Sequence, residues 1–485
     1  MRRAHRAVAD PFYRFSRWLF DRSTRIYYRR IDVEGRENLP AGPAIIVANH
    51  PNSIADGFLL MSQIPRPVCL IAKDSIVRIP VVGWLARRCG VIGVARQTEY
   101  RDRQAQRRQI NLAAIQGCAP RLAAGGMILI FGEGISSDSR RLQSIRKGAM
   151  RIGYAAEETN EFRLGVAFVP VGINYSSKNR FRSEALIRIG RPFRLRDVSA
   201  EPERDKAHVL AAGTARLQAE IEALTTNIVA EELAPLVDRL AELRSSARRL
   251  SPALWFEAQK QIAEALHYWN QTAPRRVLAL RESLAGYDRA LEQAELSDET
   301  VRQRRPRVAL AAGVTGLARS LALLAVYLYG WANSIGPRYL GRASLRFSRA
   351  GRKLGERIRG RPSEFGVTKE TASAQVGGWI GAGLFYPAQI YLVGELVRAG
   401  WGWRAGVASA AVYAFTLIPA WLFSLRHSER MQHDWQQARA AWDFLRRPRP
   451  ALRLRQRRRR LAAEVEALVR AYEAPARRAA RGITQ

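Results

Sequence analysis

Short, continuous apolar runs alternate with amphipathic stretches over the first two hundred residues. Helical periodicity is clearest over residues 103–122. Four apolar runs have the length of buried strands, namely 44–48, 68–72, 127–131 and 166–173. Strands separated by helices are typical of α/β domains, whose mostly parallel sheet carries reactive loops at the carboxyl ends of its strands. We therefore predict an α/β domain with a mostly parallel sheet flanked by helices over residues 31–200.

The segments on either side of this domain have helical patterns. Apolar residues from Leu210 to Ile228 recur in a heptad-like stripe, so we predict a helical connector without chemistry over residues 201–305. Residues 1–30 place aromatic and apolar side chains at helical spacing among arginines. This pattern fits either an amphipathic helix lying in a membrane interface or a helix docked on the domain's own core.

Three long apolar stretches follow residue 306. The stretch 405–425 holds no charged residue and is long enough to span a bilayer. Arg319 lies near the middle of the first stretch, where a charge at the bilayer centre is costly. We therefore predict a carboxy-terminal α-helical membrane region, followed by a basic helical tail. The membrane region covers residues 306–430. It contains a re-entrant or in-plane segment at 308–331 and spans at 376–397 and 405–425. The tail covers residues 431–485.

The net charge of +36 calls for a polyanionic partner, and 47% hydrophobic residues exclude a disordered chain. Residues 301–485 carry 33 basic and 10 acidic side chains, a balance of +23, whereas residues 1–300 carry only +13. Nine basic residues between Arg338 and Arg361 predict that this segment faces the cytoplasm. The expected location is the inner (cytoplasmic) membrane, with the α/β domain on the cytoplasmic side.

An arginine-rich run in the tail leaves two kinds of partner open. Six of the eight residues from Arg453 to Arg460 are arginine, as in nucleic-acid-binding segments. Because the run follows a predicted membrane hairpin, anionic membrane lipids are the favoured partner and no nucleic acid is expected. A non-enzymatic basic membrane scaffold, or a nucleic-acid-binding protein, remains the alternative to an enzyme at this stage. Neither the three cysteines nor the scattered histidines have metal-ligand spacing, so no metal site is predicted.

Residues that can carry chemistry stand at the ends of the predicted strands. His50 and Asp56 follow the first strand, where the carboxylate can orient an imidazole that serves as general base. A turn whose histidine merely caps the chain is the plainer reading of the same pair. Arg96 ends an apolar run, where it can grip a phosphate, and Glu133 lies in a Gly-Glu-Gly turn after another strand.

Four segments in this order and spacing resemble the PlsC-like glycerolipid acyltransferase family. They are residues 49–56 with Asn49, His50 and Asp56, residues 90–96, residues 131–134 and residues 169–173. The resemblance covers about residues 30 to 195. The helices and apolar stretches beyond it resemble the subgroup that carries carboxy-terminal membrane segments.

The resemblance implies a reaction and the residues that carry it out. His50, held by Asp56, would deprotonate a hydroxyl of glycerol 3-phosphate or lysophosphatidate as that hydroxyl attacks acyl-CoA or acyl carrier protein. Arg96 and Lys73 would hold the phosphate, and Glu133 with Gly134 would position the glycerol portion. No cofactor is implied beyond this acyl thioester co-substrate. Dihydroxyacetone phosphate or another lyso-lipid would suit the same chemistry.

The sequence departs from the family pattern at three places. Five residues, rather than the usual four, separate His50 from Asp56. Gly132 stands where proline is usual, and Ile135 with Ser136 replaces a common Thr-Arg, which removes a cation. Arg140, Arg146 or Lys147 could replace that cation, and Ser136 and Lys147 are included as candidate substrate-binding residues. Lys147 precedes a predicted helix whose amino end attracts phosphate.

Overall fold

The computed structural model describes residues 11–78, 80–96, 103–135, 139–178, 180–244, 251–359 and 370–482. Internal contacts divide the chain into two units, which are described separately. The first comprises Met1–Glu231 with the short segments Pro252–Phe256 and Arg352–Ala372. The second comprises Glu232–Ser251, Glu257–Gly351 and Ser373–Gln485.

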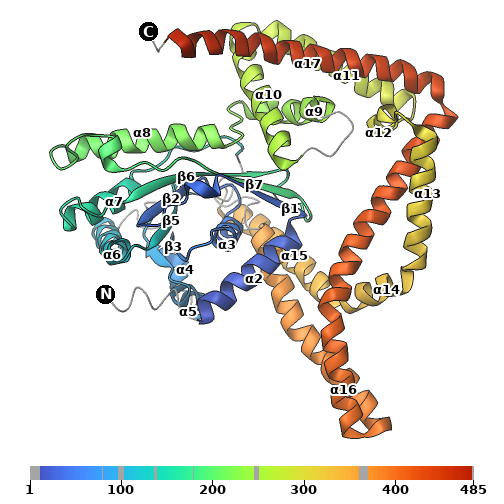
Figure 1. Ribbon diagram of the computed structural model, residues 1–485, viewed down its shortest axis with the longest axis horizontal. Coiled ribbons are helices and arrows are strands. Elements are labelled where there is room, and N and C mark those ends of the chain that lie inside the picture. The colour runs from blue at the N-terminus through green and yellow to red at the C-terminus, as the bar shows by residue number, and fades with distance from the viewer. Residues whose placement is uncertain are drawn as a thin grey trace. The chain divides into compact units, whose positions relative to one another are not determined.

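The described part of the first unit contains a seven-stranded sheet of order β1-β7-β6-β2-β5-β3-β4 (Figure 1). Only the β6–β7 pair is antiparallel, and the other neighbours are parallel. The strands are β1 (Arg30–Glu34), β2 (Ala44–Ala48), β3 (Val68–Lys73), β4 (Ile92–Val94), β5 (Met127–Phe131), β6 (Ala167–Tyr175) and β7 (Glu184–Ile189). The predicted fold class, a mostly parallel sheet flanked by helices, is confirmed.

The sequence pattern did not reveal β1 and β7, because neither strand is a plain apolar run. Charged residues occupy alternate positions of β1 and both halves of β7. The two strands pair in parallel, and Arg188 on β7 forms an ion pair with Glu34 on β1 at 3.0 Å. Cross-strand charge pairs of this kind stabilise an edge whose strands lack an apolar signature.

Helices cover both faces of the sheet. On one face, α6 (Gln104–Ala123), α7 (Gly148–Thr159) and α8 (Lys206–Leu224) share a core with Ile45 and Val47 of β2. On the other face, α3 (Ile54–Gln63) brings Leu60 against Val171 of β6. The short helices α4 (Asp74–Val77) and α5 (Pro80–Arg88) follow β3.

Helix α8 belongs to this core, although the predicted connector includes it. Val209, Leu217 and Ile221 are fully buried in the same cluster as the sheet residues. Gly172 on β6 lies so close to the end of α8 that a Cβ atom there would be 2.5 Å from the Leu224 carbonyl oxygen. The apolar stripe thus packs on the α/β unit, because a helix of this length needs a partner surface.

Helix α2 (Pro11–Tyr27) has one docked face and one exposed face. Tyr13, Phe20 and Tyr27 are buried, and Phe20 stacks on Phe58 of α3 with ring centroids 4.4 Å apart. On the opposite side Phe15 and Trp18 remain 57% and 50% exposed. The helix therefore docks on the unit's own core, and the interfacial role of its exposed aromatic side stays a prediction.

The described second unit is helical, and its last helix uses part of the arginine-rich run internally. Helix α17 (Pro448–Gly482) packs on α9 (Ala234–Arg244), α11 (Pro274–Gln293) and α12 (Asp298–Arg302). Arg458 is buried and pairs with Asp298 at 3.0 Å, and Arg455 donates to the Val301 carbonyl at 2.9 Å. Two of the six arginines in the run therefore bind protein groups. Helix α10 (Pro252–Thr272) connects α9 to α11 along the chain.

The apolar stretches form α13 (Pro306–Ala322), α14 (Leu324–Asn333) and α16 (Glu370–Arg446), with α15 (Ile335–Arg359) between them. Among the described residues, Ser373–Arg446 is long and apolar enough to cross a membrane. Helices α13 and α14 bend by 64° at their junction, which makes this pair either a broken span or a re-entrant segment. The predicted membrane path of 308–331 therefore stays open.

Helix α16 reverses direction at Gly402, which separates the two predicted spans (Figure 1). Gly402 has φ 84° and ψ 173°, a backbone region that essentially only glycine adopts. A Cβ atom at Gly394, before the turn, would lie 3.4 Å from the carbonyl oxygen of Gly406, after it. Small residues thus allow the two arms to pack closely, as in membrane helix pairs.

Candidate active site

The predicted site residues gather at one edge of the sheet. His50 follows β2, Glu133 follows β5, Lys73 ends β3 and Arg96 follows β4. These four strands are neighbours and mutually parallel, so their carboxyl ends lie side by side. The topology therefore brings together four side chains that are up to 83 positions apart in the chain.

His50 and Asp56 form a hydrogen-bonded pair. The imidazole Nδ1 lies 2.9 Å from Asp56 Oδ2, and both side chains are buried. The extra residue between them is accommodated at Ser53, whose φ of 52° places it in the left-handed region just before α3. Because a carboxylate only accepts, Nδ1 is the donor in this contact, and in the neutral imidazole Nε2 is then the basic nitrogen.

Two further donors hold the Asp56 carboxylate. The Asn52 backbone N–H donates to Oδ2 at 2.7 Å, and the Tyr175 hydroxyl donates to Oδ1 at 2.7 Å. Burial, with the nearby Asp56 charge, raises the pKa of Tyr175 well above its usual value, so the phenol stays a neutral donor. Three hydrogen bonds compensate a carboxylate that has lost all contact with water.

Glu133 holds the backbone of His50. Its Oε1 accepts the His50 backbone N–H at 2.6 Å, and its Oε2 accepts the Gln143 backbone N–H at 3.0 Å. Burial raises the pKa of Glu133, while these two N–H donors act in the opposite direction. The side chain is 5% exposed, so its geometry suits positioning of His50 rather than the predicted contact with glycerol.

Two other contacts immobilise His50. Its ring stacks on Phe131 with centroids 3.8 Å apart and planes 10° from parallel. The Asn49 side chain bridges to β6, accepting from the Ile173 N–H at 2.7 Å and donating to the Ile173 carbonyl at 3.0 Å. Phe131 thus restrains the plane of the imidazole, and Asn49 fixes the backbone next to His50 against strand β6.

The predicted phosphate-binding cations occupy the far strands of the same edge. In the strand order β2-β5-β3-β4, Lys73 is two strands from His50 and Arg96 is three, or roughly 10 and 14 Å at the backbone. Asn111 on α6 fixes the turn before Arg96, accepting from the Ala95 N–H at 2.9 Å and donating to its carbonyl at 3.1 Å.

Arg146, one of the three cations considered as a replacement for the family's arginine, packs against the Gly-Glu-Gly turn. Arg146 Nε donates to the Glu133 carbonyl at 3.2 Å, and its side chain lies over Gly134, whose φ is 68°. Lys147 is exposed directly before α7. Ser136 lies outside the described residues.

Sequence reasoning missed the supporting residues Tyr175, Asn111 and Gln143. Tyr175 alone had a signal, since it follows the fourth motif, but nothing in the sequence connects a tyrosine to an aspartate 119 positions away. Within the described residues, no group of three or more His, Cys, Asp or Glu side chains could hold a metal.

Comparison with known proteins adds an independent line of evidence. The family model described as "Acyltransferase" matches residues 30–174. Over 159 residues the chain is 31% identical to the 1-acyl-sn-glycerol-3-phosphate acyltransferase LPAT1 of Arabidopsis thaliana, covering 32% of this chain and 39% of that protein. It is 26% identical over 201 residues to glycerol-3-phosphate O-acyltransferase 2 of Saccharomyces cerevisiae, covering 40% of this chain and 26% of that protein. The chain therefore spans well under half the length of these relatives.

One solved structure, the 1-acyl-sn-glycerophosphate acyltransferase PlsC of Thermotoga maritima, is 24% identical. It covers 43% of this chain and 80% of that one, with a TM-score of 0.30. The family match spans β1 to β6 and includes His50, Asp56, Arg96 and Glu133. Residues 30–174 therefore match the acyltransferase family, and the relatives that share them are named as acyltransferases of glycerol 3-phosphate or of its 1-acyl derivative.

Proposed function

We propose that this protein transfers a fatty acyl group from acyl-CoA or acyl carrier protein to a hydroxyl of a phosphorylated glycerol. The observation that carries this proposal is the His50–Asp56 pair, in which the carboxylate accepts from Nδ1 and orients the imidazole. The names of the relatives favour glycerol 3-phosphate or lysophosphatidate as acceptor. Dihydroxyacetone phosphate or another lyso-lipid would undergo the same reaction.

The proposed reaction needs one base and no covalent acyl-enzyme. Nε2 of His50 takes the hydroxyl proton while the hydroxyl oxygen attacks the thioester carbonyl carbon. Collapse of the tetrahedral intermediate breaks the carbon–sulfur bond, and the proton on Nε2 passes to the departing thiolate. The Asp56 carboxylate stabilises the imidazolium that exists between these steps.

The cations at the sheet edge would bind the acceptor's phosphate. A phosphate held by Lys73 and Arg96 extends the acceptor along the edge towards His50, past the β5 turn with Gly134. Lys73 is one strand nearer to the base than Arg96, so it can bind a phosphate that lies closer to His50. Arg146 supplies a further cation beside the Gly-Glu-Gly turn, where the family pattern's arginine is absent.

We further propose that the protein is bound to the inner membrane with this domain in the cytoplasm. The apolar helix Ser373–Arg446 supports association with a membrane. The basic residues from Arg338 to Arg361 support the cytoplasmic side for the segment before it.

Replacement of His50 tests the reaction. His50→Ala should lower acyl transfer by about 10²–10⁴-fold, because general base catalysis contributes that much. Thiol release from acyl-CoA on addition of glycerol 3-phosphate or lysophosphatidate measures it. His208→Ala, which removes an exposed imidazole on α8, should retain full activity. A fully active His50→Ala enzyme would exclude the mechanism.

Tyr175→Phe tests the support of Asp56. A hydrogen bond to a charged group contributes about 1.5–3 kcal/mol, so kcat should fall about tenfold or more while the acceptor KM stays constant. Tyr154→Phe is the matched control, since it removes a buried hydroxyl that donates to the Pro202 carbonyl at 3.2 Å. Equal kcat values for the two variants would show that Tyr175 does not act on the base.

Arg96→Ala should raise the acceptor KM at least tenfold with a smaller change in kcat, because phosphate binding is lost in ground and transition states alike. Steady-state kinetics with varied glycerol 3-phosphate provides the two constants. Arg108→Ala removes an exposed cation on α6 and should leave both unchanged. An unaltered KM in Arg96→Ala would remove this arginine from the site.

The membrane orientation can be tested with two introduced cysteines. Gly351 on α15 and Gly400 at the tip of the α16 hairpin both have open space for a side chain, and the native cysteines are all buried. A membrane-impermeant thiol reagent applied to intact cells should label Gly400→Cys but not Gly351→Cys. Labelling of Gly351→Cys from outside would reverse the proposed orientation.

A further inference from the structure

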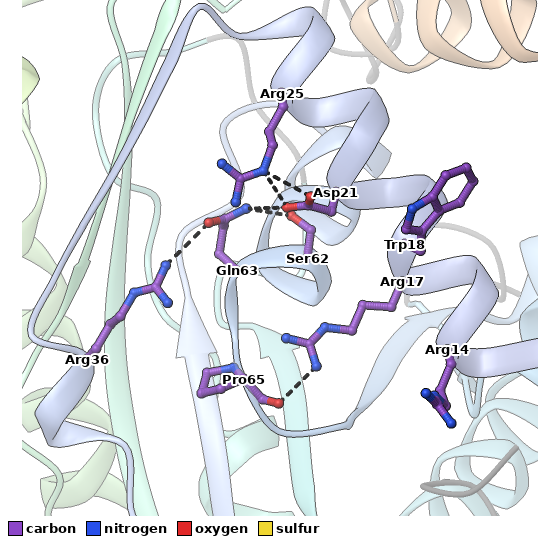
Figure 2. A pocket seen from close by; sticks show the side chains of 9 residues that line it. All are labelled: Arg14, Arg17, Trp18, Asp21, Arg25, Arg36, Ser62, Gln63 and Pro65. Carbon is purple, nitrogen blue, oxygen red and sulfur yellow. Dashed lines mark hydrogen bonds and ion pairs between the residues drawn. The ribbon is translucent and has the colours of Figure 1, made fainter. Parts of the chain in front are cut away.

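A cavity of about 450 Å³ lies in the first unit at a distance from the candidate active site. This volume falls within the range of small-molecule binding sites. Figure 2 shows that its walls come from α2, from the end of α3 and from the segment after β1. The lining residues are Arg14, Arg17, Trp18, Asp21, Arg25, Arg36, Ser62, Gln63 and Pro65.

The cavity and His50 lie at opposite edges of the sheet. Gln63 and Pro65 precede β3, so they lie at its amino end, whereas His50 follows the carboxyl end of the parallel strand β2. Strand β1 is parallel to β7, β7 is antiparallel to β6, and β6 is parallel to β2, so β1 runs opposite to β2. Arg36 follows β1 and therefore lies at the same edge as Gln63 and Pro65. The five residues of β2 alone separate the edges by roughly 16 Å. A glycerol phosphate reacting at His50 is too short to reach this cavity.

The cavity has an excess of positive charge. Four arginines and a single carboxylate, that of Asp21, line it. Arg25 Nε pairs with Asp21 at 2.8 Å, Arg17 donates to the Pro65 carbonyl at 2.9 Å, and Arg36 donates to Gln63 Oε1 at 3.4 Å. These bonds hold the guanidinium groups of Arg17, Arg25 and Arg36 around Gln63 (Figure 2).

The remaining donors of these arginines suit a phosphate. A guanidinium has five N–H donors in a planar fork that matches two phosphate oxygens. Arg17 donates to the Pro65 carbonyl through Nη1, and Arg36 donates to Gln63 through Nη2. Fixed arginines lose less conformational entropy when they bind, so an anion that enters the cavity meets a preformed site.

Two exposed aromatic side chains, Phe15 and Trp18, favour a lipid over a soluble anion as the ligand of the cavity. Trp18 lines the cavity, is 50% exposed, and stacks on Phe15, which is 57% exposed, with centroids 5.9 Å apart. Exposed aromatic side chains beside arginines are typical of membrane interfaces, where the rings lie at the level of the headgroups. We propose that this cavity binds the phosphate group of an anionic phospholipid whose acyl chains contact Phe15 and Trp18.

The test uses the full-length protein purified in a maltoside detergent. Dihexanoyl phosphatidylglycerol is the probe, because it is neither substrate nor product of acyl transfer to glycerol 3-phosphate or lysophosphatidate. Calorimetric titration should show saturable binding, and Arg17→Ala/Arg36→Ala should weaken it at least tenfold. Arg163→Ala/Arg204→Ala also removes two cations from exposed positions and should bind within twofold of the unaltered protein.

Further measurements distinguish a lipid phosphate from free phosphate and keep the test valid if the first variant misfolds. Inorganic phosphate should compete at least tenfold more weakly than the lipid; equal competition would overturn the lipid assignment. Unchanged binding by the Arg17→Ala/Arg36→Ala protein would overturn the site itself. If that protein unfolds, Arg17→Lys/Arg36→Lys keeps the charge but loses the planar fork, and should still bind severalfold more weakly. His50→Ala should bind the lipid normally, so this result is independent of the proposed reaction.

Discussion

The buried carboxylate of Asp56 is the constraint on which the candidate active site depends. It joins three segments: the loop after β2 through His50 and Asn52, the first turn of α3, and the end of β6 through Tyr175. An ionised carboxylate without water is stable only when donors surround it. The chain must therefore bring all three segments together, and the same contacts that satisfy Asp56 orient the imidazole.

A second buried carboxylate completes this arrangement from the other side. Asp56 holds the His50 ring, whereas Glu133 holds the His50 backbone. The two carboxylates thus share the task of fixing one histidine, and neither needs to touch the acceptor. The cations proposed to bind the acceptor, Lys73 and Arg96, lie on the neighbouring strands β3 and β4.

The chain's large positive charge has several separate uses. In the second unit, Arg455 and Arg458 bind carbonyl and carboxylate groups of the protein itself. In the first unit, Arg96 lies at the catalytic edge of the sheet, and Arg17 and Arg36 line the proposed lipid site at the opposite edge. The α/β unit thus carries cationic groups at both edges of its sheet.

The sequence by itself determined the α/β class, the strands that precede His50 and Glu133, and the four motifs, because buried parallel strands are apolar runs and their reactive turns follow directly. It did not predict β1 and β7, whose charged residues pair across the strands, or the packing of α8 on the sheet. Only the tertiary structure decided that Glu133 supports His50, that Tyr175 binds Asp56, and that four arginines line one cavity. Each of these depends on contacts between residues far apart in the chain, which local patterns of polarity do not encode.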